Sequence, residues 1–438
     1  MNTQLKTIFV FLFLVCTLRG TAQNFSIDYP SYQNRNSDAL EISRIVRNDT
    51  ATILYMDAYS RPNYWIRLAS GLSLHGNQTG KNYPIIRSQG FELDKEVYMP
   101  ASGNVTFSLQ FAPLAPQEKM IDFIEGANKG DFQIKSISLN EQEKKGKIHC
   151  HISGKVIDSP QSSRLVLMKA HKNPSSSPWL SIPIRNGEFQ YDFYADHEEV
   201  YEVFIWNDML TGSWLPSLFF AENGPVSFTL YPASTRKPGL VSTSNPLTCE
   251  LQQLESERKA KFNFDSLYAQ MNKLYEENRF ESEALQTLWK RIEQVKDNNE
   301  ERNNIYRERD RLEESGEAYT EEGKALLVKI KQLNEEMNQW TIKHIKQNPS
   351  LPGLYVLTSK TEMARKGEDV TPFLNAYQET FASLYPEHPY SQQMQMLIKN
   401  GQPEIGKPYV DFSAPDLDGN KVQISKYIQG KVALIDLW

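Results

Sequence analysis

A long stretch without proline most constrains how this chain can fold. Between Pro246 and Pro349, only Gly316 and Gly323 interrupt a polar and strongly charged sequence. Proline and glycine are the residues that most disfavour a helix interior, so their scarcity favours long helices. We therefore expect a mainly α-helical region over residues 246–400.

Apolar residues within this region recur at helical spacing. One set shares a helix face and comprises Leu285, Leu288, Trp289, Ile292 and Val295. A later set comprises Leu326, Ile330, Leu333, Met337 and Trp340. Such faces are typical of amphipathic helices, which must cover their apolar stripe, so we expect helices folded back on one another. The charged residues between them are interpreted as solvated surface.

The part of the chain before the helices has the pattern of β structure. Val105, Phe107, Leu109 and Phe111 alternate with polar residues, which is typical of a strand with one buried face. Short apolar runs separated by turn-forming clusters recur over residues 24–140. We therefore predict a β-sandwich-like domain there.

A charged spacer at residues 140–147 separates a second β region. Strand-like runs recur over residues 147–235, and Asn186-Gly187 indicates a hairpin turn because both residues tolerate positive φ. We predict a second small β domain over this range.

The N-terminus has the pattern of a secretory signal peptide. Lys6 precedes an apolar run from Thr7 to Leu18, and small residues lead to Ala22. This run is short for a membrane-spanning helix, so we expect residues 1–22 to be cleaved and the chain to be exported to the periplasm or cell envelope. An uncleaved anchor is the alternative. A lipoprotein site at Cys16 is disfavoured by the bulky Val15 before it.

Composition limits the class of partner. The chain of 438 residues has 48 basic and 54 acidic residues, for a net charge of -6. Nothing in this balance favours nucleic acid or an anionic membrane, and we expect neither. The sequence leaves the oligomeric state open.

Two cysteines, Cys150 and Cys249, remain after the signal peptide. They are too far apart in sequence for a close-spaced redox pair and too few for a disulfide scaffold. Two alternatives stay open, namely one structural bridge between them or two unpaired, buried thiols.

The segment after Asn400 changes pattern again. It combines a turn at Asp418-Gly419, a candidate strand at residues 421–424, a break at Gly430-Lys431 and an apolar strand from Val432 to Leu437. Residues 406–438 resemble the start of the TlpA- and ResA-type thioredoxin-like thiol-disulfide oxidoreductases of the bacterial envelope. The matching elements are Gly406-Lys407-Pro408, Asp411-Phe412, Asp416-Leu417-Asp418-Gly419, Gly430-Lys431 and Asp436-Leu437-Trp438.

The resemblance implies a C-terminal α/β thioredoxin-like domain and redox chemistry on protein thiols or disulfides, with no cofactor and no metal. In that family the last strand leads into Ala-x-Trp-Cys-x-x-Cys, whose first cysteine attacks as a thiolate. This sequence stops at Trp438, before such a motif, so we expect a fragment that is inactive in dithiol exchange. Asp436 matches the buried carboxylate that assists proton transfer to the second cysteine.

Two functions follow as hypotheses. The first is a fragment of an exported thiol-disulfide oxidoreductase, in which the β and helical regions position the redox domain. The second is a non-catalytic binding or structural protein of the envelope with a vestigial thioredoxin segment.

Three further groups of residues could have a functional role, but a structural role explains each of them better. His149 and His151 offer two metal ligands on one strand face, which is an incomplete site. Asp122 and Glu125 are interpreted as cap or turn residues rather than as a catalytic pair. Six aromatic residues that could line a groove are assigned to core packing instead, namely Tyr201, Phe204, Trp206, Trp214, Phe219 and Phe220.

Overall fold

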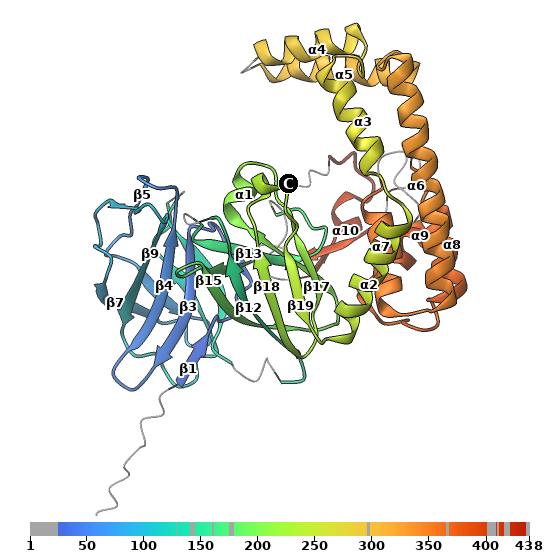
Figure 1. Cartoon of the computed structure of the whole chain (residues 1–438). Helices are drawn as coiled ribbons and strands as arrows, with labels where there is room; N and C mark the ends of the chain where they lie inside the picture. Colours follow the sequence, from blue (N-terminus) through green and yellow to red (C-terminus); the bar gives the residue numbers. More distant parts are fainter. Residues whose placement is uncertain are drawn as a thin grey trace, which may run out of the picture.

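The structure is a computed structural model of the whole chain. It describes residues 25–128, 130–140, 145–159, 162–174, 179–295, 298–364, 368–400, 409, 411–415 and 421–434. A β-rich N-terminal part is followed by a mainly helical part, as the sequence predicts (Figure 1). The expected signal peptide and Asp436 lie outside the described residues.

The first β region is one curled, nine-stranded antiparallel sheet. In spatial order its strands are β1 (Phe25–Asp28), β3 (Leu40–Arg47), β4 (Thr52–Tyr59), β9 (Asn104–Phe111), β7 (Asn82–Gln89), β6 (Ser73–Gly76), β10 (Met120–Ile124), β11 (Gln133–Ser138) and β2 (Asn34–Arg35). A separate pair is formed by β5 (Trp65–Ile66) and β8 (Val97–Tyr98).

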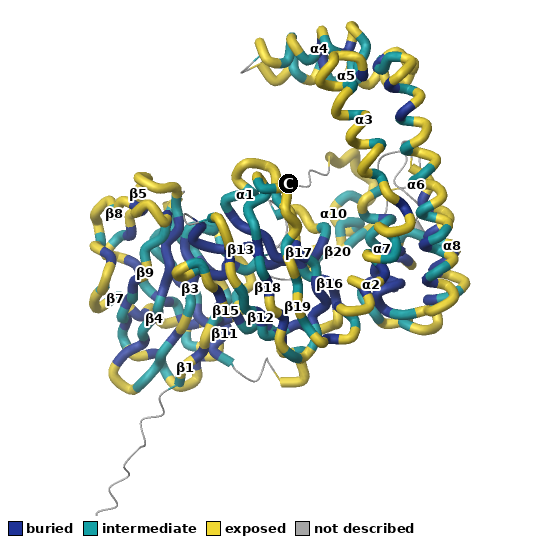
Figure 2. The backbone as a smooth tube through the Cα atoms, viewed as in Figure 1, coloured by how far each residue is buried: buried dark blue, intermediate teal, exposed yellow. Residues whose placement is uncertain are grey.

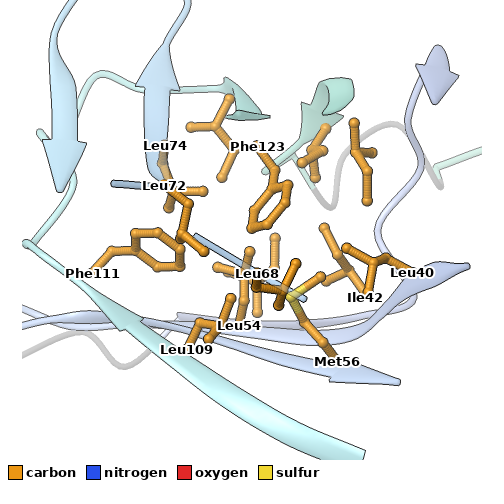
Figure 3. Close-up of a cluster of buried hydrophobic side chains, with 14 of the residues drawn as sticks. Leu40, Ile42, Leu54, Met56, Leu68, Leu72, Leu74, Leu109, Phe111 and Phe123 are labelled. Atoms are coloured by element: carbon orange, nitrogen blue, oxygen red, sulfur yellow. The ribbon is translucent and has the colours of Figure 1, made fainter. Parts of the chain in front are cut away.

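Curling brings the two halves of this sheet together across one core. Figure 3 shows Leu54 and Phe111 on one side of this core and Phe123 on the other, all of them buried. The alternation on β9 is confirmed, because Phe107, Leu109 and Phe111 are buried. The sequence predicts a sandwich-like domain here. The structure makes the two facing layers from a single sheet, because an alternating pattern specifies a buried face but not which strands share a sheet.

The second β region consists of two four-stranded sheets. One has the order β15 (Glu188–Ala195), β12 (Ile148–Val156), β18 (Gly224–Leu230) and β19 (Leu240–Thr243). The other has the order β14 (Leu180–Pro183), β13 (Arg164–Lys169), β16 (Val200–Ile205) and β17 (Ser217–Phe220). In the chain, the short helix α1 (Trp206–Leu210) comes directly after β16. Buried residues of both sheets form one cluster, so the sheets pack face to face.

The tight turn predicted at Asn186-Gly187 is confirmed and is closed by the antiparallel bridge Arg185↔Glu188, but the two strands that it joins lie in different sheets. The turn joins β14 to β15, with φ of 54° at Asn186 and 76° at Gly187. Positive φ at both central residues is the geometry that matches the twist of the flanking strands.

Eight helices lie within the described part of residues 246–400. They are α2 (Pro246–Lys261), α3 (Asp265–Glu276), α4 (Glu283–Gln294), α5 (Asn299–Ser315), α6 (Glu321–Gln347), α7 (Leu351–Glu362), α8 (Thr371–Thr380) and α9 (Pro389–Asn400). Their starts follow capping chemistry, since the hydroxyls of Ser282, Thr320 and Ser350 each accept a backbone N–H three residues on.

The helical part divides into a base and a projecting arm. In Figure 1, α3, α4, α5 and the adjoining half of α6 extend away from the β regions, and Figure 2 shows that most of the arm is exposed. The arm has a small core of its own, in which Leu285 and Leu288 are buried with Ile305. The apolar face predicted for residues 285–295 is thus confirmed.

The base of the helical part is bonded to the second β region. The Glu222 carboxylate accepts the N–H groups of Leu247 and Thr248 at 3.1 Å each and so caps α2. The Tyr390 hydroxyl accepts the N–H of Val200 at 2.6 Å. Val200 and Phe220 share a buried cluster with α7, α8 and α9. No helix in the described ranges is both long and apolar enough to cross a membrane.

The pairing of β12 with β18 leaves no room for a side chain at Gly154, so a substitution there tests the structure of the second β region. A Cβ at Gly154 would clash with the carbonyl oxygen of Phe228. We expect Gly154→Ala to lower the free energy of unfolding by about 1–3 kcal/mol, the usual cost of overpacking. Thermal or urea unfolding followed by circular dichroism measures the change.

Gly71→Ala is the matched control, because a Cβ at Gly71 meets no atom within 4 Å. Equal stability of the two variants would contradict the packing of β12 on β18.

Candidate functional site

The described part of the terminal segment folds locally as a hairpin and a short helix. Strand β20 (Ser413–Pro415) pairs antiparallel with β21 (Lys421–Gln423), and α10 (Ser425–Ile428) follows. The expected strand at residues 421–424 is therefore present. The expected turn at Asp418-Gly419 lies outside the described residues, between β20 and β21.

Asp411 ties this hairpin to the helix. One oxygen of its carboxylate accepts the N–H of Ser425 at 3.0 Å, and the other accepts the side-chain amide of Gln423 at 2.7 Å. The hydrogen bond from Ser425 lowers the pKa of Asp411. The carbonyl of Phe412 accepts the N–H of Ile424 at 3.0 Å. The Asp411-Phe412 pair, which carries part of the family resemblance, thus has a local structural role.

The expected apolar strand from Val432 to Leu437 is not formed over residues 432–434, and its remaining residues lie outside the described ranges. Val432 and Leu434 are fully exposed, at 107% and 95%.

Neither described cysteine is placed for dithiol chemistry. Both are free, so no bridge joins them. Cys150 is buried in the core of the second β region, and burial raises the pKa of its thiol to about 12. Cys249 is exposed, which differs from the expectation of two buried thiols, and its thiol donates to the Thr243 carbonyl at 3.4 Å.

His149 and His151 converge on one carboxylate. Their ring nitrogens lie 2.8 Å and 3.0 Å from the same oxygen of Asp192 on β15. Among the described residues there is no group of three or more His, Cys, Asp or Glu arranged to hold a metal ion. Asp122 and Glu125 have structural roles but do not cap local turns as expected, because most of their hydrogen bonds join them to other strands and loops. Asp122 accepts the N–H of Ser136 at 2.7 Å, and Glu125 accepts those of Ala69 and Phe132 at 2.7 Å and 2.8 Å.

A cavity of about 520 Å³ lies between the two β regions and is here called the tyrosine cavity. One wall comes from the end of β1 and residues 29–32, and the other from β13, β14, β15 and β16. Its aromatic lining comprises Tyr29, Tyr32, Trp179, Tyr191, Phe193, Tyr194 and Tyr201. Its volume is in the range of small-molecule pockets.

Tyr29 closes one side of the tyrosine cavity by packing on Tyr191, with ring centroids 4.2 Å apart. Burial raises the pKa of Tyr29 to about 12 and also raises the pKa values of Tyr32, Tyr191 and Tyr201. These four hydroxyls therefore stay protonated near neutral pH and can each donate one hydrogen bond.

Two arginine–carboxylate pairs lie behind the cavity. Arg35 pairs with the buried Glu41, and its guanidinium stacks 4.8 Å from the ring of Trp179. Arg164, 1% exposed, bonds Asp38 at 3.1 Å and lies 4.1 Å from the ring of Trp206. Burial lowers the pKa of Arg164 and is also the main cause that raises the pKa of Glu41. The Arg164–Asp38 pair and the stacking of Arg35 on Trp179 join the two β regions, whereas the Arg35–Glu41 pair lies within the first.

Sequence reasoning found only part of this site. Of the six aromatic residues weighed in sequence, only Tyr201 lines the cavity, and the other five pack in apolar clusters as predicted. Tyr29 and Tyr32 were missed because they lie outside regular strands, where periodicity carries no signal. The close spacing of the two tyrosines, Tyr29 and Tyr32, is the one sequence signal that could have indicated this site.

Comparisons with known proteins give no family. No family model matches, and no curated protein matches. Among solved structures, a family CBM26 carbohydrate-binding module of Eubacterium rectale Amy13K, in complex with maltoheptaose, matches at 12% identity and a TM-score of 0.17, over 41% of this chain and 93% of that chain.

Two further solved structures match at similar levels. A type I pullulanase of Bacillus subtilis, complexed with maltose, has 10% identity and a TM-score of 0.12, over 39% of this chain and 23% of that chain. A pilus 2b backbone protein of group B streptococcus has 8% identity and a TM-score of 0.11, over 38% and 83%. All these TM-scores lie well below the level that marks a common fold.

A second titratable site lies where the second β region meets the helices. Glu202 on β16 is 4% exposed, and burial raises its pKa to about 7. The Nε2 atom of the neighbouring His171 lies within hydrogen-bond distance of two hydroxyls on α7, that of Tyr355 at 2.8 Å and that of Ser359 at 3.0 Å. Burial lowers the pKa of His171.

Glu202 predicts a pH dependence of stability. A carboxyl whose pKa rises on folding stabilises the fold below its unfolded pKa, and that contribution is lost as the pH rises through about 7. We expect Glu202→Gln to match the wild type at pH 5 and to be more stable at pH 8.5 by about 1–2 kcal/mol, a value reduced from the full shift for residual solvent screening. Urea unfolding at both pH values measures the difference.

Glu188→Gln is the control, because Glu188 is an exposed carboxylate on the neighbouring sheet. A pH-independent difference between Glu202→Gln and the wild type would show that Glu202 is ionised in the fold.

Proposed function

We propose that residues 406–438 begin a thioredoxin-like thiol-disulfide oxidoreductase module and that the β and helical regions form its exported platform. The observation that carries this proposal is the capped hairpin-helix unit. The Asp411 carboxylate accepts from Ser425 at the start of α10 and from Gln423 on β21. The unit thereby gives a structural reason for the motif residues that suggested the resemblance.

The exposed residues after α10 support the same proposal. Val432 and Leu434 belong to the apolar stretch proposed as a central strand of the module, and a central strand needs neighbours on both sides and on both faces. In this proposal Asp436 lies beneath a cysteine pair and exchanges a proton with the second cysteine.

The cysteine pair itself is absent from these 438 residues. Cys16, Cys150 and Cys249 are the three cysteines, and no two of them form a Cys-x-x-Cys sequence. Cys150 cannot substitute, because the raised pKa of its thiol disfavours the thiolate that attacks a disulfide. Dithiol exchange is thus proposed only for a chain that continues through such a motif.

The second candidate is a binding protein of the envelope. The tyrosine cavity favours this function, since it is a concave aromatic site that owes nothing to the terminal segment. The two functions are compatible within one chain.

A disulfide-reduction assay tests the redox proposal. We expect the 438-residue chain to reduce a model disulfide such as insulin no faster than the background reaction. A version extended by a Cys-x-x-Cys helix and the remaining strands of a thioredoxin-like domain should be active, because the first cysteine then has a helix N-terminus to stabilise its thiolate.

The extended chain with both added cysteines changed to serine is the control, and Asp436→Asn in the active form should slow turnover. Comparable activity of the 438-residue chain, or full activity of Asp436→Asn, would contradict the proposed roles.

Export has a separate test. We propose that the chain is cleaved after Ala22, which rests on the sequence pattern of residues 1–22. Expression in a Gram-negative host followed by mass spectrometry should give a mature chain that begins at Gln23. Retention of the apolar run in a membrane fraction would support the anchor instead.

A further inference from the structure

We propose that the tyrosine cavity binds a carbohydrate, with aromatic rings against the C–H faces of the sugar and tyrosine hydroxyls against its hydroxyl groups. This function goes beyond the proposed redox module and does not depend on it. The cavity lies between the two β regions, so both must be folded and docked to form it.

The cavity holds hydrogen-bonding groups that the described protein does not satisfy. The hydroxyls of Tyr32, Tyr191 and Tyr201 have no hydrogen-bond partner in the described part of the chain, although Tyr191 is only 4% exposed. A polar group in largely apolar surroundings is costly without a hydrogen bond, so a ligand that supplies that bond gains binding free energy. Three such hydroxyls within one aromatic wall fit a ligand that carries several hydroxyl groups.

The charged pairs around the cavity argue against an anionic ligand. Three lysines lie on its rim, and each is paired with a carboxylate. Lys147 pairs with Asp196 at 3.1 Å, Lys169 pairs with Glu199, and Lys172 pairs with Glu362. Glu41 is likewise paired with Arg35. A phosphate or carboxylate ligand would have to compete with these pairs, whereas a neutral polyhydroxylated ligand would not.

The aromatic rings of the cavity suit the apolar C–H faces of a sugar ring. Tyrosine and tryptophan give rigid contact area at a small cost in side-chain entropy, and their faces pack against C–H groups. Trp179 is held in place by Arg35 at 4.8 Å and Arg164 at 5.4 Å from its ring. The wall is therefore built before a ligand arrives, which lowers the cost of binding.

An adjoining hollow extends the site. A second hollow of about 450 Å³ shares Asp28, Tyr29, Tyr191, Asp192 and Tyr194 with the tyrosine cavity. Beyond this shared wall it is lined by His149 and Gln190. The two hollows adjoin at this shared wall, and their polar and aromatic linings provide room for a sugar ring in each, so we assign the site to a disaccharide or longer glycan.

Titration of the purified chain with maltose, cellobiose and N,N′-diacetylchitobiose tests the proposal. Tryptophan fluorescence reports on Trp179, and saturation-transfer NMR reports on the sugar. We expect saturable binding of at least one disaccharide in the millimolar range. The double variant Tyr32→Phe/Tyr191→Phe keeps both rings and should weaken this binding by about tenfold, which corresponds to one or two lost hydrogen bonds.

Tyr64→Phe is the matched control, because Tyr64 is 58% exposed and does not line the cavity. Near-ultraviolet circular dichroism shows whether each variant keeps the native fold. Indole and inorganic phosphate are titrated in parallel as a purely aromatic and a purely ionic probe.

Three results would overturn the proposal. The first is the absence of saturable binding for all three sugars. The second is equal sugar affinity in the wild type and the double variant. The third is binding of indole or phosphate without binding of a sugar. Failure of the disulfide-reduction assay would leave this result unaffected, since the cavity contains no residue of the terminal segment.

Discussion

The arrangement of the two β regions depends on one buried cation. Arg164 on β13 is almost fully buried, and its guanidinium donates to the Asp38 carbonyl at 2.8 Å and to the Asp38 carboxylate at 3.1 Å. It also lies 4.4 Å from the ring of Tyr59 and 4.1 Å from that of Trp206. Removing a guanidinium from water costs several kcal/mol, so the fold is stable only with these partners in place. Asp38 and Tyr59 belong to the first region, and Arg164 and Trp206 to the second.

The tyrosine cavity is a consequence of this docking. Arg35 and Arg164 both stack on Trp179, and Arg185 of the second region reaches Asp57 of the first at 3.3 Å. These contacts bring residues 29–32 over the open side of the second β region, where Tyr29 meets Tyr191. The helical base is attached through Glu222 and Tyr390, and at the cavity rim through the pair of Lys172 with Glu362 of α7, whereas none of the cavity-lining residues belongs to the helical arm.

Sequence reasoning succeeded where the pattern is local. The alternation on β9, the tight turn at Asn186-Gly187 and the apolar face of α4 could each be predicted, because neighbours within one element produce them. It was less successful where strands from distant parts of the chain combine. The first region is one sheet because β7 pairs with both β9 and β6. Its two edges are linked through the chain, because β2 lies between β1 and β3 in sequence but pairs with β11 at the far edge, at Arg35 opposite Ile134. No short window of sequence contains that pairing.

The sequence by itself determined the order of β and helical regions, the places of the main turns and caps, and the motif residues of the terminal segment. These follow from hydrophobic periodicity and backbone preference, which act over a few residues. Only the tertiary structure decided that Tyr29, Tyr191 and Tyr201 line one cavity and that Cys150 is buried while Cys249 is exposed. The physical reason is that burial and the docking of two regions depend on contacts between residues far apart in the chain, of which Arg164 with Asp38 is the clearest example.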